Sequence, residues 1–226
     1  MKWRTTRKAA LRTYALGATV LGAALACAPT AAAPMVPGDP AESASRPAAG
    51  PLPPGFGTLH QDDFTLSIRA EPLLIKVTPL AEEVILLAAP DTYDRLHAIA
   101  ASRRAEAAAA ARVPEPALFL VSLLSGQPDA RFQPDDLHLL NRGRLLRPRA
   151  ILPITPEWGR LTASQHEPQS AIYVFDPEID LELPLVVRYG ARESNDWMRI
   201  LDRLRDERAK VRARSGAGLT PVSRTP

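Results

Sequence analysis

The chain has 226 residues, of which 46% are hydrophobic and 23% charged, and its formal net charge is +3 at pH 7. Five of its 28 lysines and arginines lie in the first 26 residues, which contain no acidic residue. The rest of the chain therefore carries a net charge of about −2, without the basic excess of nucleic-acid-binding proteins. We expect no nucleic-acid partner.

Residues 1–26 have the pattern of a bacterial signal peptide. A basic start is followed by an apolar run over residues 13–26, which has the length of a signal-peptide core, roughly 7 to 15 residues, and is too short to span a bilayer. Ala24 and Ala26 supply the small residues that a signal peptidase requires immediately before Cys27. We expect export to the cell envelope and a mature chain that begins at Cys27.

Cys27 is the only cysteine, so the chain cannot form an intrachain disulfide. Residues 24–27 resemble the lipobox of bacterial lipoproteins, in which the cysteine sulfur receives a diacylglycerol and the new amino group an acyl chain. The resemblance implies lipidation at Cys27 and membrane anchoring, facing the periplasm or the cell surface. Ala24 stands where the lipobox usually has Leu, Val or Ile, so plain secretion with a free thiol is the alternative.

Residues 27–57 are rich in Ala, Pro, Gly and Ser and contain few large apolar side chains. Such a segment cannot bury enough surface to offset its chain entropy. We predict a disordered tether here and a second disordered segment at 215–226. The tether would reach about 30 Å as a random coil and about 90 Å as polyproline II.

Residues 58–214 are long enough for one domain with its own core. Phe64, Leu66 and Ile68 alternate with polar residues, which is typical of a half-buried strand. Proline and glycine separate further apolar runs, so we predict a mainly β fold, an antiparallel sandwich. The further predicted strands are residues 73–78, 83–88, 117–124, 137–141, 145–154, 171–175 and 181–189.

Two segments interrupt the strand pattern. We predict an inserted helix at 91–112, which begins at Asp91 and stops before Pro114, and a C-terminal helix at 194–214. The second helix carries one apolar stripe, which we expect to dock on the sandwich through Trp197. The stripe consists of Trp197, Ile200, Leu201, Leu204 and Val211.

Four stretches are similar to the small immunoglobulin-like domains of bacterial surface lipoproteins: residues 132–137, 141–143, 147–148 and 172–177. They form the pattern of a hairpin with a glycine turn and a following proline, ahead of an aromatic strand. The resemblance implies an immunoglobulin-like sandwich, although the two helices are not part of that pattern. It carries over no catalytic residue.

No motif of a nucleophilic hydrolase, a zinc protease or a phosphate-binding loop is present. We therefore expect no enzyme activity and no cofactor. A zinc or copper site would require His138 and His166 to converge with a carboxylate, and this metal-binding protein or metal-dependent enzyme is one alternative function.

An acidic run follows the aromatic strand. Asp176, Glu178, Asp180 and Glu182 alternate with other residues, so in an extended chain they face one side. We predict ion pairs between Arg147 and Arg149 and the three acids Glu178, Asp180 and Glu182. The alternatives are a solvated acidic edge that discourages strand addition and a calcium site.

Trp158 lies in a predicted turn, where it is either a contact for a partner or, the interpretation we favour, a plug that closes the end of the sandwich. The sequence as a whole favours an exported, lipid-anchored envelope protein that acts as a non-catalytic binding or structural module for an unknown envelope protein. The first alternative to this interpretation, ahead of the metal-binding one, is a subunit of an envelope secretion or transport assembly. In that case the apolar stripe of the helix at 194–214 would be exposed to a partner.

Overall fold

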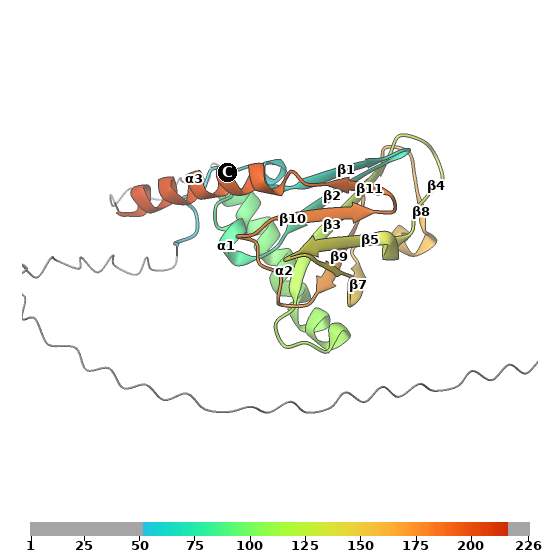
Figure 1. Ribbon diagram of the computed structural model, residues 1–226, viewed down its shortest axis with the longest axis horizontal. Helices are drawn as coiled ribbons and strands as arrows, with labels where there is room; N and C mark the ends of the chain where they lie inside the picture. The colour runs from blue at the N-terminus through green and yellow to red at the C-terminus, as the bar shows by residue number, and fades with distance from the viewer. Residues whose placement is uncertain (1–51, 217–226) are drawn as a thin grey trace, which may run out of the picture. The chain divides into compact units, whose positions relative to one another are not determined.

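The computed structural model describes residues 52–216, which belong to one compact unit (Figure 1). The predicted signal peptide, Cys27, most of the predicted tether and residues 217–226 lie outside the described residues. The description below therefore concerns the predicted domain and the last part of the tether.

The larger sheet has five strands, and each strand pairs antiparallel with its neighbour. Its central strands, β3 and β9, are almost continuous apolar runs because both of their faces are buried. In spatial order the strands are β1 (Leu66–Ala70), β2 (Leu73–Pro79), β3 (Ala117–Ser125), β9 (Gln169–Phe175) and β7 (Ala150–Pro153).

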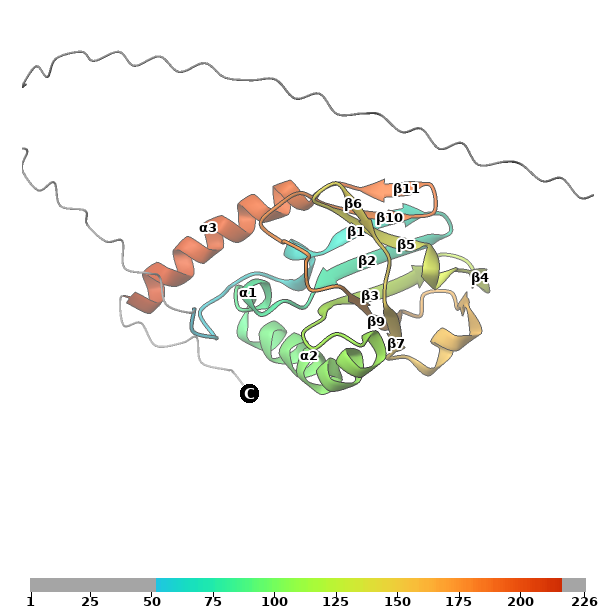
Figure 2. The same cartoon turned by 60° about the horizontal axis from the view of Figure 1, so that its bottom comes forward.

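The second sheet has four antiparallel strands, and β1 of the larger sheet lies against its strands β10 and β11 (Figure 2). On β5 and β10 alternate residues are buried, as expected for strands with one face on the core. The order is β11 (Arg192–Ser194), β10 (Leu185–Tyr189), β5 (Leu137–Asn141) and β6 (Arg144–Leu146), and a separate short pair joins β4 (Ala130–Arg131) to β8 (Thr162–Ala163).

Two long helices complete the fold. Helix α2 (Pro90–Ala111) begins with a proline at its first turn, ends at Arg112 in a left-handed conformation, and packs against β7 and β9. Helix α3 (Trp197–Gly216) lies along β10 and the 3-10 helix η1 (Gln61–Phe64). The shorter helices are α1 (Glu82–Ile85), η2 (Pro134–Asp136) and η3 (Pro156–Arg160).

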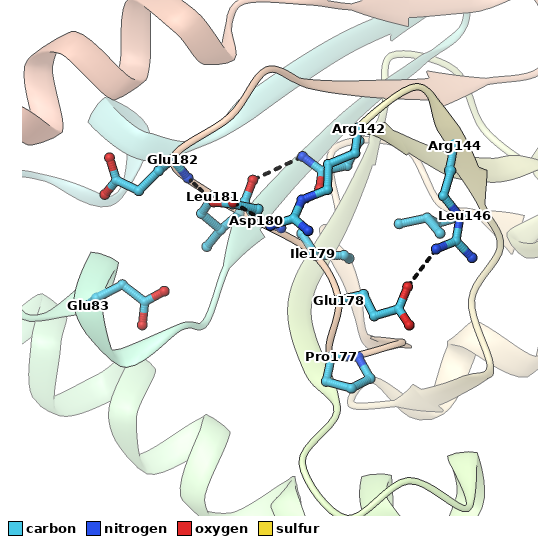
Figure 3. Close-up of a pocket in the computed structure, with 11 residues that line it drawn as sticks. Glu83, Arg142, Arg144, Leu146, Pro177, Glu178, Ile179, Asp180, Leu181 and Glu182 are labelled. Atoms are coloured by element: carbon cyan, nitrogen blue, oxygen red, sulfur yellow. Dashed lines mark hydrogen bonds and ion pairs between the residues drawn. The ribbon is translucent and has the colours of Figure 1, made fainter. Parts of the chain in front are cut away.

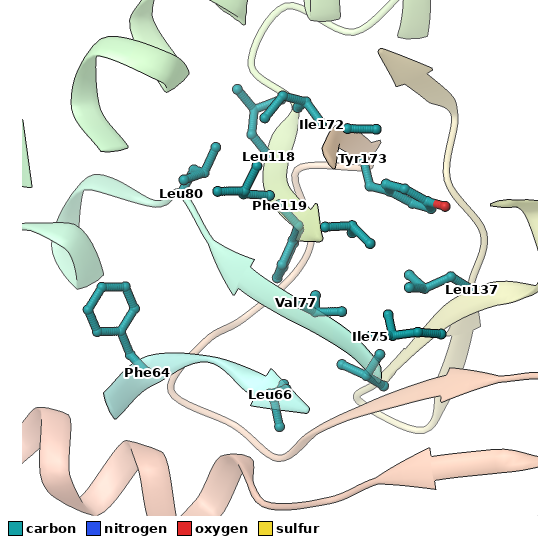
Figure 4. Packing of buried hydrophobic residues seen from close by; sticks show 14 of the residues in the cluster. Phe64, Leu66, Ile75, Val77, Leu80, Leu118, Phe119, Leu137, Ile172 and Tyr173 are labelled. Carbon is teal, nitrogen blue, oxygen red and sulfur yellow. The ribbon is translucent and has the colours of Figure 1, made fainter. Parts of the chain in front are cut away.

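One hydrophobic cluster includes residues of both sheets and all three α-helices (Figure 4). Ile75 and Val77 of β2 and Tyr173 of β9 belong to it together with Leu137 of the second sheet. Phe119 and Phe175 meet edge to face with ring centroids 5.5 Å apart. The expectation of a mainly antiparallel β fold with an inserted helix and a C-terminal helix is therefore confirmed.

Three predicted strands differ from the structure. Residues 83–88 form the end of α1 and a turn, because a helical turn buries Val84 and Ile85 together. Residues 145–154 divide at Pro148 between β6 and β7, which belong to different sheets. Residues 181–189 become a strand only from Leu185, directly after Pro184.

The packed domain begins earlier than residue 58. Leu52 and Phe56 pack against the hydrophobic cluster and Gly57 is buried, although the sequence places them in the tether. At the other end, α3 includes Ser215 and Gly216, which were expected to belong to the tail. Residues 52–57 therefore belong to the packed domain and not to the predicted tether.

Candidate functional site

The acidic run, residues 176–184, is a loop between β9 and β10 and not a strand; we call it the acidic loop. Asn141, at the end of β5, is only 3% exposed and fixes this loop. Its Nδ2 donates to the backbone oxygens of Asp180 at 2.9 Å and Pro184 at 3.1 Å, and its Oδ1 accepts from the Asp180 nitrogen at 2.9 Å. On the α3 side, Trp197 Nε1 donates to the Leu181 oxygen at 3.0 Å.

Arginines do face the acids of this loop, but none of the predicted pairs is formed (Figure 3). Arg149, the predicted residue that does form an ion pair, binds Asp176 and not one of the three acids expected for it. Arg147 forms no ion pair in the described chain. The pairs are Arg142–Asp180 at 2.6 Å, Arg144–Glu178 at 2.6 Å, Arg149–Asp176 at 3.0 Å, Arg208–Glu182 at 2.7 Å and Arg205–Glu182 at 3.5 Å.

The error in pairing has a local cause. Arg142 and Gly143 both have positive φ and form the two-residue turn of the β5–β6 hairpin. This turn places Arg142 and Arg144 beside the acidic loop. The Arg142 guanidinium holds the pKa of Asp180 below its ordinary value, since it donates a hydrogen bond to the ionised form.

Two adjoining hollows lie along the acidic loop, and we call them together the loop groove. The first, of about 340 Å³, lies between the loop, the β5–β6 hairpin and Glu83. The second, of about 280 Å³, extends from Glu83 along the ends of β2 and β3. Both hollows are lined by Glu83, Pro177, Ile179 and Leu181.

Glu82 and Glu83 of α1 have different surroundings in this groove. Glu82 accepts a hydrogen bond from the Tyr93 hydroxyl at 2.8 Å and lies 3.1 Å from Nδ1 of His97. Burial and this hydrogen bond raise the pKa of Tyr93 to about 12. Glu83 is exposed and has no hydrogen-bond or ion-pair partner among residues 52–216.

Trp158 is 3% exposed. Its ring meets those of Phe132 and Tyr173 edge to face, with centroids 4.9 and 6.1 Å away. Its burial agrees with the interpretation that the sequence favoured, a side chain packed in the core, and it offers almost no surface to a partner. The sequence predicted both the strand that contains Tyr173 and the turn that contains Trp158.

The two histidines of the metal alternative lie on separate elements, His138 on β5 and His166 in the turn between β8 and β9. His138, on β5, has Nδ1 at 3.0 Å from the Asp136 oxygen, and His166 is exposed beside the end of β3, where its nitrogen donates to the Ser125 oxygen. Across residues 52–216, no group of three or more His, Cys, Asp or Glu side chains has the geometry to hold a metal ion. Neither the histidine site nor the calcium alternative gains support from this arrangement.

A buried carboxylate that sequence reasoning missed joins the two ends of the domain. Glu207 of α3 is 3% exposed, and its Oε1 accepts from the Thr58 nitrogen at 3.1 Å, the Thr58 hydroxyl at 2.9 Å and Arg214 at 3.0 Å. Arg214 also donates to the Phe56 oxygen. Asp206, the preceding residue, is exposed. Glu207 differs from the other acids of α3 only because it lies on the side of the helix that faces the domain.

The described helices include none that is both long enough and apolar enough to cross a bilayer. No protein-family model matches the chain, and neither a curated protein nor a solved structure shows significant similarity to it. The functional argument therefore depends on the residues and on the geometry of the loop groove.

Proposed function

We propose that this chain is an exported envelope protein, anchored by lipid at Cys27, which works by contact through the loop groove and performs no chemistry. The signal-peptide pattern, the lipobox-like residues 24–27 and the proline-rich segment support this proposal. Together they describe a folded domain on a tether at a membrane surface. Its partner in this account is another envelope protein.

The observation that carries the proposal is the burial of the apolar stripe on α3. Trp197 is fully buried, and the other four stripe residues are at most 3% exposed. The one large apolar side chain of α3 that is exposed is Met198, at 43%. Because the helix uses its stripe to complete its own domain, a self-contained module is favoured over an assembly subunit that offers this helix to a partner.

We propose in addition that the domain is an immunoglobulin-like sandwich. Two antiparallel sheets that share one hydrophobic cluster support this fold, as does an aromatic side chain, Trp158, at the end of the core. Helix α2 covers part of the larger sheet, at β7 and β9, and is an addition to that pattern.

Site-specific photo-crosslinking in cells tests the contact function. A photoreactive residue replaces Pro177 in the loop groove, Met198 on α3, or Glu167, an exposed acid on the turn between β8 and β9. We expect one discrete crosslinked species from position 177 and none from position 167. A species that forms only from position 198 would contradict the proposal and favour the assembly subunit.

A further inference from the structure

The chemistry of the loop groove indicates what it binds. Six carboxylates and three arginines line its two hollows, so the lining is acidic overall. Three of the carboxylates are neutralised by arginines and a fourth, Glu82, is held by Tyr93 and His97. The six are Glu82, Glu83, Glu115, Glu178, Asp180 and Glu182.

Glu83 is the charge at the centre of the groove. It lines both hollows, has no partner among the described residues, and stands across the first hollow from Ile179 and Asp180 (Figure 3). Glu115, which lines the second hollow, also has no hydrogen-bond or ion-pair partner among residues 52–216. Arg104 lines the same hollow and offsets the charge of Glu115 there. The unpaired charge next to the acidic loop is thus negative.

Apolar side chains also line the groove, and we call them its floor. Ile179 and Leu146 lie at the first hollow, and Leu181 continues this surface into the second hollow beside Leu80. An aliphatic stem could lie on such a floor while its charged end meets Glu83. Lysine and arginine side chains have this construction, whereas a simple cation would gain nothing from the floor.

We propose that the loop groove binds an extended segment of a partner protein in which a lysine or arginine is two positions from an apolar residue, since alternate side chains of an extended chain face the same side. The basic side chain occupies the first hollow, with its charge at Glu83, and the apolar side chain occupies the second. The inference rests on the proposed contact function, of which it names the partner's chemistry. The acidic loop is a fixed wall of this site, because Asn141 and Trp197 hold its backbone from two sides.

The test uses the protein as isolated from cells that express the full chain, isotope-labelled for amide chemical-shift measurements. The probe, the Lys-Leu peptide, is the capped peptide Ser-Gly-Lys-Ser-Leu-Gly-Ser, and the two control peptides carry Glu in place of Lys or Ser in place of Leu. We expect saturable shifts at residues 79–83, 141–146 and 177–182, with a dissociation constant of about 0.1 to 1 mM, as for a short flexible ligand. The two control peptides should bind at least about fivefold more weakly.

Two variants of Glu83 and one control locate the charge. Glu83→Lys and the milder Glu83→Gln should each weaken binding of the Lys-Leu peptide, by about tenfold and about threefold, while Glu167→Lys leaves it unchanged. Equal binding of the Glu-Leu peptide, or full binding by both Glu83 variants, would overturn the inference. So would the absence of saturable shifts up to about 5 mM peptide. None of these results alters the expected anchoring at Cys27 or the crosslink from position 177, which report on the contact function itself.

Discussion

Asn141 and Asp180 are 39 positions apart in the sequence and form two hydrogen bonds. The side-chain amide of Asn141 bonds the backbone of Asp180, as the backbone of a neighbouring strand would in a sheet. The amide group of Asn141 donates to the Asp180 oxygen and accepts from the Asp180 nitrogen, both at 2.9 Å. The acidic loop is thereby attached to the second sheet although it forms no strand. The geometry of the loop groove depends on this attachment.

Asn141→Ala should reduce the free energy of unfolding by about 2 kcal/mol, because it leaves backbone groups of Asp180 and Pro184 without partners. Urea unfolding measures the loss. The matched control is Asn195→Ala, at an exposed asparagine, which should stay within about 0.5 kcal/mol of the wild type. An equal effect of the two substitutions would mean that the Asn141 bonds contribute nothing to stability.

Glu207→Ala should cost about 3 kcal/mol, since it removes a buried acceptor from Thr58 and leaves Arg214 without its carboxylate. Its neighbour Asp206→Ala is the control and should change stability by at most about 0.5 kcal/mol. Hydrogen exchange adds a local measurement: the Thr58 amide should lose its protection in Glu207→Ala. If that amide stays protected, the bond between the two ends of the domain is not formed in solution.

Gly57→Ala should disturb the start of the domain, because a β-carbon at this position would collide with the backbone of Leu87 and Ala88. Leu59, two residues after this glycine, forms backbone hydrogen bonds with Leu87 and Ala89, so the chain has little room to move away. We expect a loss of more than about 2 kcal/mol in thermal or urea unfolding. Gly126→Ala, where the added carbon meets nothing within 4 Å, should be nearly neutral. A neutral Gly57→Ala would show that residues 52–57 are not packed on the domain.

The ion pair between Arg142 and Asp180 predicts a pH dependence of stability. The pKa of Asp180 is lower in the folded protein than in the unfolded chain, chiefly because Arg142 donates to the carboxylate. Its contribution is therefore present above the unfolded pKa, near pH 4, and is lost as the pH falls through the folded value. Asp180→Asn should be less stable than the wild type at pH 7, and the difference should shrink below about pH 4.

Urea unfolding of both proteins at several pH values measures this difference. Arg142→Met is the control, because without the guanidinium the substitution Asp180→Asn should show a much smaller dependence on pH. A difference between wild type and Asp180→Asn that stays constant from pH 7 to strongly acidic pH would contradict the assignment.

Much of the sheet structure could be predicted because the residues concerned carry a local pattern. Leu66 and Ile68 alternate with polar side chains, and β1 has this alternation in its burial. Helix α2 spans residues 90–111, where the sequence predicted 91–112. The agreement is close because Pro90 and the alanine run mark the helix locally. In each case neighbouring residues determine the conformation, so the sequence pattern is sufficient.

The acidic loop could not be predicted in the same way. Alternating acids between Asp176 and Glu182 imitate the two-residue period of a strand, and only Pro177 and Pro184 argue against one. The attachment to Asn141 joins distant segments, and no local pattern encodes it. The same holds for Glu207, which pairs with Thr58 from the other end of the domain. The sequence predicted that arginines pair with the acidic loop. It did not predict which arginines, because the hairpin turn at Arg142 places Arg142 and Arg144 there.

The anchoring of the chain at Cys27 is tested most directly by mass spectrometry of the mature N-terminus, combined with membrane fractionation of the wild type and Cys27→Ser. The account predicts that the wild type begins at Cys27, carries a diacylglycerol and an acyl chain, and sediments with the membrane. It predicts that Cys27→Ser is exported less efficiently and leaves the membrane fraction. A wild-type N-terminus with a free thiol, or a Cys27→Ser protein that stays with the membrane, would contradict it.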